Sequence, residues 1–137
     1  VTEFDAGYLA GFFALLGHLY PIYFGFKGGK GVLTSLGIIL VVNPLVFFIL
    51  LIIFLPVLFI TRIVSLVSVT GALLYPFVTL IVDLCLRKPL LFDFLFAALF
   101  SVIVIFKHRG NIQRLINGTE RRIGDKKTDI PQTESKN

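Results

Sequence analysis

Long apolar stretches separated by short polar ones dominate the chain. They cover residues 6–26, 32–42, 45–60, 63–86 and 90–106. About 20 apolar residues in a helix cross the hydrocarbon core of a bilayer. The 11 residues of 32–42 span only about 16 Å as a helix, so this segment must tilt, use flanking residues or lie within protein. The pattern predicts an all-α, polytopic transmembrane bundle with about five membrane helices.

Composition supports a membrane protein. The mean hydropathy is +0.92, and only 15% of the residues are charged, against about a quarter in soluble domains. The single cysteine, Cys85, allows no disulfide within the chain. Asp83 is an acid inside an apolar run, and we expect it near the far interface, beside Arg87 and Lys88.

The basic residues predict the topology. Lys27 and Lys30 follow the first apolar segment, and seven of the thirteen basic residues lie between Lys107 and Lys127. Cytoplasmic loops are rich in Lys and Arg. Four apolar passes separate Lys30 from Lys107, and an even number returns the chain to the same face. Arg62 falls after two of them. The turn at residues 27–31, the Arg62 region and the basic tail are therefore predicted to share the cytoplasmic surface.

The end of the chain is polar. Ile112, Leu115 and Ile116 have helical spacing, which predicts a short interfacial helix that Gly118 would end. We expect residues 1–123 to form the transmembrane domain. Residues 124–137 are expected to be a disordered cytoplasmic tail.

A glycine-rich basic turn lies between the first two apolar segments. Its glycines leave backbone N–H groups accessible and its lysines add positive charge, a combination that suits a phosphate. It is not a nucleotide-binding P-loop, because Phe24 stands where the first glycine belongs and Gly31 replaces the hydroxyl residue. The alternative is a plain turn whose lysines mark the cytoplasmic side.

Two stretches together resemble a known family. They are Gly17-His18, Pro21 and Phe26-Lys27-Gly28-Gly29-Lys30-Gly31-Val32 with Thr34-Ser35, and then His108-Arg109-Gly110-Asn111-Ile112-Gln113-Arg114-Leu115-Ile116-Asn117-Gly118-Thr119-Glu120. They resemble the second and third signatures of the PlsY-type acyl-phosphate:glycerol-3-phosphate acyltransferases. The stretch Arg62 to Ser68 is similar to the serine-bearing helix start between them.

The resemblance implies a seven-helix membrane bundle, of which this chain would hold the last five helices. The family's first signature would precede residue 1. The implied reaction transfers a fatty acyl group from acyl phosphate to the 1-hydroxyl of glycerol 3-phosphate, as the first acylation of phospholipid synthesis in the bacterial cytoplasmic membrane. An acyl phosphate is already activated, so we expect no metal and no cofactor. The partners expected are both substrates and the bilayer, with no nucleic acid, and a monomeric full-length protein.

The resemblance also implies roles for individual residues. Catalysis would involve Lys30, His108, Asn111 and Glu120. Gly28, Gly29 and Gly31 would hold the acyl phosphate group, and the remaining substrate-binding residues would be Lys27, His18, Ser65, Ser68, Arg109 and Arg114. Of the two serines, the spacing from Lys30 favours Ser68. His18 could instead be a buried, hydrogen-bonded histidine.

Other functions remain open. Acyl-CoA-dependent acyltransferases with a His-x4-Asp motif find no support, because Tyr23 follows His18 and Gln113 follows His108 at that spacing. A transporter of anionic phosphate esters would need phosphate-binding groups on a path to both faces, whereas in this chain they gather on one face. A third interpretation is a catalytically incomplete membrane scaffold, since the first signature is missing from the 137 residues.

Overall fold

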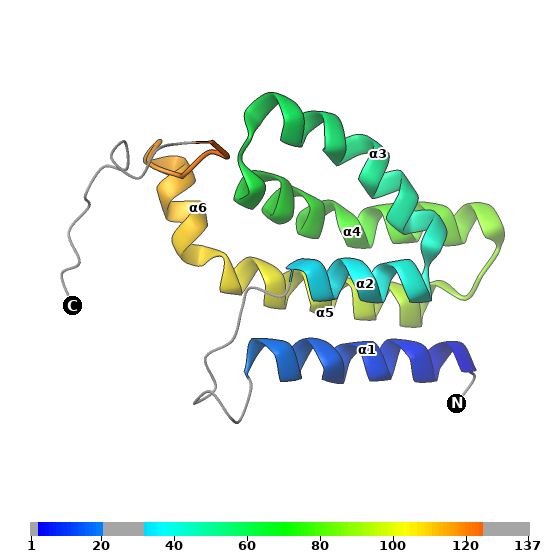
Figure 1. Cartoon of the computed structure of the whole chain (residues 1–137). Helices are drawn as coiled ribbons and strands as arrows, with labels where there is room; N and C mark the ends of the chain where they lie inside the picture. Colours follow the sequence, from blue (N-terminus) through cyan, green and yellow to red (C-terminus); the bar gives the residue numbers. More distant parts are fainter. Residues whose placement is uncertain (1–2, 21–31, 125–137) are drawn as a thin grey trace.

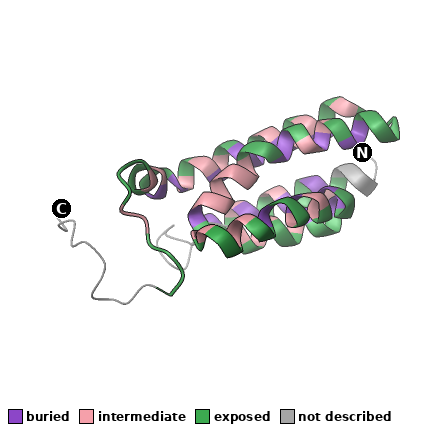
Figure 2. Cartoon of the chain, turned by 90° about the horizontal axis from the view of Figure 1, so that it is seen from above, coloured by how far each residue is buried: buried purple, intermediate pink, exposed green. Residues whose placement is uncertain are grey.

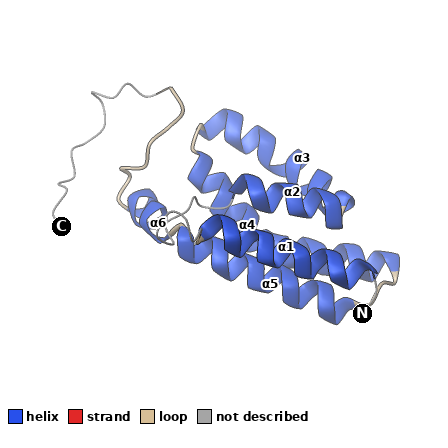
Figure 3. Cartoon of the chain, turned by 60° about the horizontal axis from the view of Figure 1, so that its bottom comes forward, coloured by secondary structure: helices blue, strands red, loops and turns tan. Residues whose placement is uncertain are grey.

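The computed structural model describes residues 3–20 and 32–124, with side chains from residue 6 onward. Within this part of the chain all regular structure is helical, which confirms the all-α prediction (Figure 3). The helices are α1 (Glu3–Leu19), α2 (Val32–Val42), α3 (Pro44–Thr61), α4 (Val64–Leu86), α5 (Leu90–Lys107) and α6 (Arg109–Ile116).

The helix bounds follow the apolar segments closely, with one correction. The first segment was predicted to run to about residue 26, but α1 ends at Leu19 and Tyr20 forms a bend. Tyr20 precedes Pro21, and a residue before proline is disfavoured in the helical conformation. Residues 21–26 of the predicted segment lie outside the described residues.

Short turns with identifiable chemistry join the longer helices. The side chain of Asn43 accepts a hydrogen bond from the Val46 N–H at 3.4 Å, and Pro44 occupies the first turn of α3. Helices α3 and α4 each have an arginine in the left-handed conformation as the C-cap residue, Arg62 with φ 57° and Arg87 with φ 55°. These turns make α2 to α5 a run of helices connected by short links.

The helices form one bundle (Figure 1). Helix α4 packs against α5 and α3, while α1 packs against α2 and α5. Aromatic contacts join α1 to α5: the ring centroids of Tyr8 and Phe96 lie 5.6 Å apart, and those of Phe12 and Phe100 lie 6.3 Å apart. Gly11 lets α1 and α2 approach closely, because a Cβ there would lie 2.5 Å from Cγ2 of Ile38.

The outer surface of the bundle is apolar. Leu33, Val41, Phe59 and Ile60 are each more than three-quarters exposed. In Figure 2 the exposed (green) and buried (purple) positions alternate along the helices. Helices α3, α4 and α5 are long and apolar enough to cross a membrane, whereas the apolar parts of α1 and α2 are shorter. An exposed apolar surface of this extent is what a lipid environment covers. The chain is an integral membrane protein.

A buried polar group lies at the end of the bundle opposite α6. Asp83 of α4 and Asp93 of α5 are both buried, together with Tyr8 and Asn43. Asp83 does lie one turn before Arg87, as expected for a residue near the interface, but its side chain is completely buried. This group is remote from the residues that the sequence places in the site.

Candidate functional site

The predicted site residues on α4, α5 and α6 that the structure describes gather where α5 ends and α4 begins. Helix α6 follows α5 directly and contacts both α4 and α5. The segment after α6 returns to the turn between α3 and α4, where the Ile123 N–H donates to the Arg62 carbonyl at 2.7 Å. The predicted meeting of the Arg62 region with the basic tail is thereby confirmed.

The glycine-rich turn lies outside the described residues. This includes Lys27, Gly28, Gly29, Lys30 and Gly31, so their predicted roles remain predictions. Both neighbours of the turn lie at the α6 end. Nζ of Lys107 is 3.8 Å from the centroid of the Tyr20 ring, at the end of α1, and Val32 lines the same cavity as Ser68.

His108 stands at the junction of α5 and α6 and is 1% exposed. Its Nδ1 lies 2.8 Å from the carbonyl oxygen of Val104, one turn back on α5. A carbonyl accepts only, so in the neutral ring the proton is on Nδ1 and Nε2 has the lone pair. The ring is thus oriented by α5, and in this form Nε2 can act only as a hydrogen-bond acceptor.

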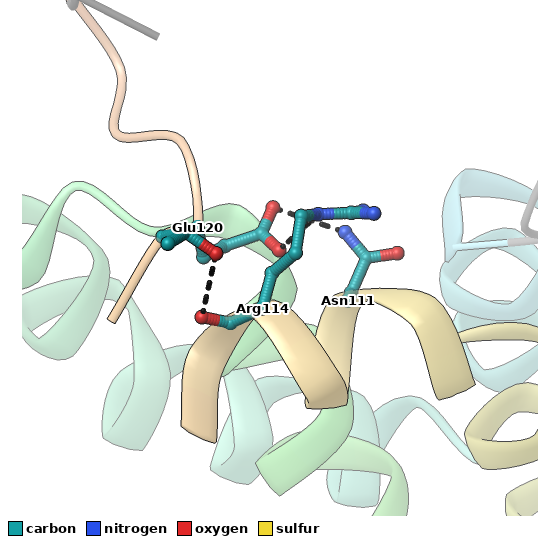
Figure 4. A network of polar contacts seen from close by, with 4 residues as sticks. Asn111, Arg114 and Glu120 are labelled. Atoms are coloured by element: carbon teal, nitrogen blue, oxygen red, sulfur yellow. Dashed lines mark hydrogen bonds and ion pairs between the residues drawn. The ribbon is translucent and has the colours of Figure 1, made fainter. Parts of the chain in front are cut away.

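Asn111, Arg114 and Glu120 form a polar network on α6 and the segment that follows it (Figure 4). The Asn111 amide nitrogen donates to Oε1 of Glu120 at 3.0 Å, and Nε of Arg114 donates to Oε2 at 3.1 Å. The Thr119 N–H donates to the Arg114 carbonyl at 2.8 Å, which folds the chain back onto the helix. Glu120 therefore fixes the orientations of the other two side chains.

The burial of this network differs between its members. Asn111 is buried at 6% exposure and the Glu120 side chain is 9% exposed, whereas the Arg114 side chain is 46% exposed. The ion pair between Arg114 and Glu120 is accordingly screened by solvent. The bond between Asn111 and Glu120 is the better protected and carries more of the network's stability.

The two candidate serines on α4 are in different states. Ser68 lines the cavity described below, and its hydroxyl donates to the Val64 carbonyl at 2.8 Å. Ser65 is buried at 7% exposure, and its hydroxyl has no hydrogen-bond partner among the described residues. Of the two, only the Ser65 hydroxyl lacks a partner among the described residues, whereas the spacing from Lys30 favours Ser68.

Two further predicted binding residues are exposed. The Arg109 guanidinium donates to the Phe106 carbonyl at 3.1 Å and lies 4.6 Å from the centroid of the Phe106 ring. His18 is exposed in the last turn of α1. The alternative of a buried, hydrogen-bonded His18 is therefore wrong.

An apolar cavity of about 190 Å³ lies between α2, α3, α4 and α5. A smaller apolar cavity can already hold a hydrocarbon ring. The residues around it come from four helices and are Val32, Ser35, Leu36, Ile39, Leu50, Leu51, Phe54, Leu55, Leu58, Val67, Ser68, Gly71, Ala72, Tyr75, Phe100, Ser101 and Val104. From position 67 to position 75 of α4 it extends about 12 Å into the bundle.

The cavity reaches the outer surface. Leu36 and Leu55 line it and are 36% and 39% exposed.

Ser35 also lines the cavity, although it is absent from the predicted site residues. The sequence does contain a signal for Ser35, because positions 32, 35, 36 and 39 fall on one helical face.

Within residues 3–20 and 32–124, no three His, Cys, Asp or Glu side chains come together as metal ligands would.

Buried polar side chains thus lie at one end of an apolar cavity inside a bundle of membrane helices. The family model for Glycerol-3-phosphate acyltransferase matches residues 2–118. The chain therefore belongs to the glycerol-3-phosphate acyltransferase family.

Known relatives agree with this assignment. The glycerol-3-phosphate acyltransferase of Syntrophomonas wolfei is 49% identical over 82% of this chain and 55% of its own length. That of Clostridioides difficile is 47% identical over 89% of this chain and 57% of its own length. The crystal structure of PlsY, an integral membrane glycerol 3-phosphate acyltransferase in its glycerol 3-phosphate form, superposes with a TM-score of 0.75 at 34% identity. The match covers 88% of this chain and 59% of that one. The chain thus spans somewhat more than half the length of these relatives.

Proposed function

We propose that the protein transfers a fatty acyl group from an acyl phosphate to the 1-hydroxyl of glycerol 3-phosphate. The observation that carries this proposal is the position of the buried His108 and the Asn111–Glu120 pair, at the end of the bundle where an apolar cavity begins. The names of the relatives support glycerol 3-phosphate as the acceptor. The acyl phosphate as donor rests on the glycine-rich turn that precedes α2 in the chain.

The reaction forms one bond and breaks one. The 1-hydroxyl oxygen of glycerol 3-phosphate attacks the acyl carbonyl carbon. The bond from that carbon to the phosphate oxygen then breaks, and the hydroxyl proton ends on the released phosphate. The products are 1-acyl-glycerol 3-phosphate and inorganic phosphate. An acyl phosphate has a good leaving group, so holding both substrates in position and stabilising charge supply the catalysis.

The substrates would occupy different parts of the site. The acyl chain lies in the cavity between α2 and α5, whose lining is apolar apart from a few hydroxyls. Its phosphate lies at the glycine-rich turn, where Lys30 neutralises charge. Glycerol 3-phosphate is bound by Ser65, His108 and Asn111, with Arg109 and Arg114 supplying positive charge near its phosphate.

The positive-inside rule supports a cytoplasmic location for this end of the bundle. Lys107 and Arg109 stand at the end of α5, and Arg62 closes α3 on the same side. The protein would therefore work in the bacterial cytoplasmic membrane with its site facing inward, in the first acylation of phospholipid synthesis.

Asn111→Ala tests the assignment, with Gln113→Ala as the matched control. Both residues are on α6, but Asn111 is buried in the network and Gln113 is exposed. We expect Asn111→Ala to lower kcat/KM for glycerol 3-phosphate by about tenfold or more, since a hydrogen bond to a charged substrate is worth about 1.5–3 kcal/mol. Gln113→Ala should leave it unchanged. Full activity of Asn111→Ala would remove this network from the site.

A further inference from the structure

Ser35 is unlike the two other serines around the cavity, Ser68 and Ser101. Its Oγ is buried, yet it has no hydrogen-bond partner within the part of the chain that the structure describes. Helical Ser and Thr hydroxyls commonly bond the carbonyl one turn back. Ser68 does so with Val64 at 2.8 Å, and Ser101 does so with Ala97 at 2.9 Å.

A buried hydroxyl without a hydrogen-bond partner destabilises a protein. Such groups are rare unless a ligand or a water molecule supplies the missing hydrogen bond. Ser35 lines a cavity whose walls are otherwise almost entirely apolar, and its hydroxyl has no partner among the described residues. The group that would satisfy it is an oxygen that enters this cavity as part of a mostly hydrocarbon molecule. A fatty acyl group is such a molecule, and its one polar atom inside the cavity is the carbonyl oxygen.

The position of Ser35 along the chain fits that atom. It lies in the first turn of α2, which begins at Val32 directly after the glycine-rich turn. An acyl carbonyl carbon is bonded to an oxygen of its phosphate. With the phosphate bound next to Val32 in the sequence, as proposed above, and the chain in the cavity, the carbonyl would lie near the start of α2.

We propose that the Ser35 hydroxyl donates a hydrogen bond to the carbonyl oxygen of the acyl donor and stabilises the negative charge that develops there during transfer. This inference rests on the proposed function. When the glycerol 3-phosphate hydroxyl attacks, the carbonyl oxygen becomes an oxyanion, and a preorganised donor binds it more strongly than the neutral carbonyl. Ser35 is then a catalytic residue that acts on kcat.

The proposal is tested by the kinetics of three variants of the protein at its full encoded length: Ser35→Ala, Ser35→Thr and Thr70→Val. Loss of one oxyanion donor costs about 10²–10³-fold in kcat in other enzymes. For a single hydroxyl we expect Ser35→Ala to lower kcat on the order of 10- to 100-fold, with little change in KM for palmitoyl phosphate. Ser35→Thr keeps a hydroxyl and should restore most of the rate.

Thr70→Val is the matched control, because it also removes a hydroxyl from a bundle helix. The Thr70 hydroxyl already bonds the Leu66 carbonyl at 2.7 Å and does not line the cavity. This variant should keep its kcat. An unchanged kcat in Ser35→Ala would overturn the proposal, whatever happens to KM.

A second measurement separates this proposal from the proposed function. A β-ketophosphonate analogue of palmitoyl phosphate, with a ¹³C-labelled carbonyl, is bound to the protein and its carbonyl stretch is recorded by infrared spectroscopy. A hydrogen bond lowers that frequency, and the shift should be lost in Ser35→Ala and kept in Thr70→Val. Binding of the analogue without a shift that depends on Ser35 would refute the role of Ser35 alone. Failure of the wild-type protein to bind it would refute the acyl phosphate site itself.

Discussion

Removal of Glu120 should impair the enzyme through Asn111. In Glu120→Ala the Asn111 amide loses its acceptor at 3.0 Å, and Arg114 loses its partner at 3.1 Å. Asn111 is buried at 6% exposure, so its amide has little access to water as a replacement. The side chain then loses a contact that holds it in the orientation in which we propose that it meets glycerol 3-phosphate.

The two contacts differ in magnitude. A hydrogen bond to a charged group contributes about 1.5–3 kcal/mol. The Arg114 side chain is 46% exposed, so its ion pair contributes about 0–1 kcal/mol after solvent screening. Most of the loss thus comes from Asn111. Expressed as transition-state stabilisation, about 1.5–3 kcal/mol corresponds to a roughly ten- to hundredfold fall in kcat/KM.

The assay is the initial rate of phosphate release from palmitoyl phosphate, with the protein in lipid nanodiscs and glycerol 3-phosphate varied. Glu120→Ala is measured in the wild-type and in the Asn111→Ala background, which forms a double-mutant cycle. Glu120→Gln keeps a carbonyl that can accept from Asn111, and it should lose less than about tenfold.

The cycle distinguishes two roles for Glu120. If Glu120 acts by positioning Asn111, its removal costs almost nothing once Asn111 is gone. If the two losses multiply in the double variant, Glu120 contacts the substrate independently and its positioning role is refuted. Helix content by circular dichroism, compared between variants, shows whether they are folded.

Three further predictions concern the cavity, the serines and the helix packing. Gly71→Leu should shift the preference toward shorter acyl donors, because a Cβ there meets only side-chain carbons at 4.0 Å and a larger side chain extends into the cavity. Relative rates with decanoyl, myristoyl and stearoyl phosphates measure this preference, and an unaltered preference would contradict the prediction. Ser65→Ala should raise KM for glycerol 3-phosphate several-fold, and by more than Ser68→Ala does. The reason is that the Ser65 hydroxyl lacks a partner among the described residues, whereas the Ser68 hydroxyl has one. Equal kinetics of the two variants would count against this prediction. Gly11→Val should lower the midpoint of thermal unfolding in detergent, because the new Cβ would collide with Ile38. Adding Ile38→Ala should restore part of the loss. An unchanged midpoint in Gly11→Val would show that α1 and α2 do not approach this closely.

Much of the fold follows from the sequence because a membrane restricts the options. Backbone groups in lipid must bond within their own segment, so a long apolar stretch has to be helical. Asn43-Pro44, Arg62 and Lys88-Pro89 mark the turns, and the helices end within a few residues of them. The exception is α1, where the apolar residues continue past the helix and Pro21, rather than polarity, determines the end.

The site could be predicted only in part. Chain parity placed the start of α4 and the basic segment after α5 on one face, and the hydrogen bond between Ile123 and Arg62 confirms it. The partners of individual hydroxyls could not be predicted, because they depend on rotamers and on neighbours from other helices. Ser65 and Ser68 are alike in sequence, yet only one of them has its hydroxyl satisfied by α4 itself.

The central claim is the use of acyl phosphate as donor, and a comparison of donors tests it most directly. The protein at its full encoded length is purified in lipid and given labelled glycerol 3-phosphate with palmitoyl phosphate or, separately, palmitoyl-CoA. Each reaction is run with and without a chelator. We expect labelled 1-acyl-glycerol 3-phosphate from palmitoyl phosphate alone, at a rate that the chelator does not change. Product from palmitoyl-CoA alone, or from neither donor, would contradict it.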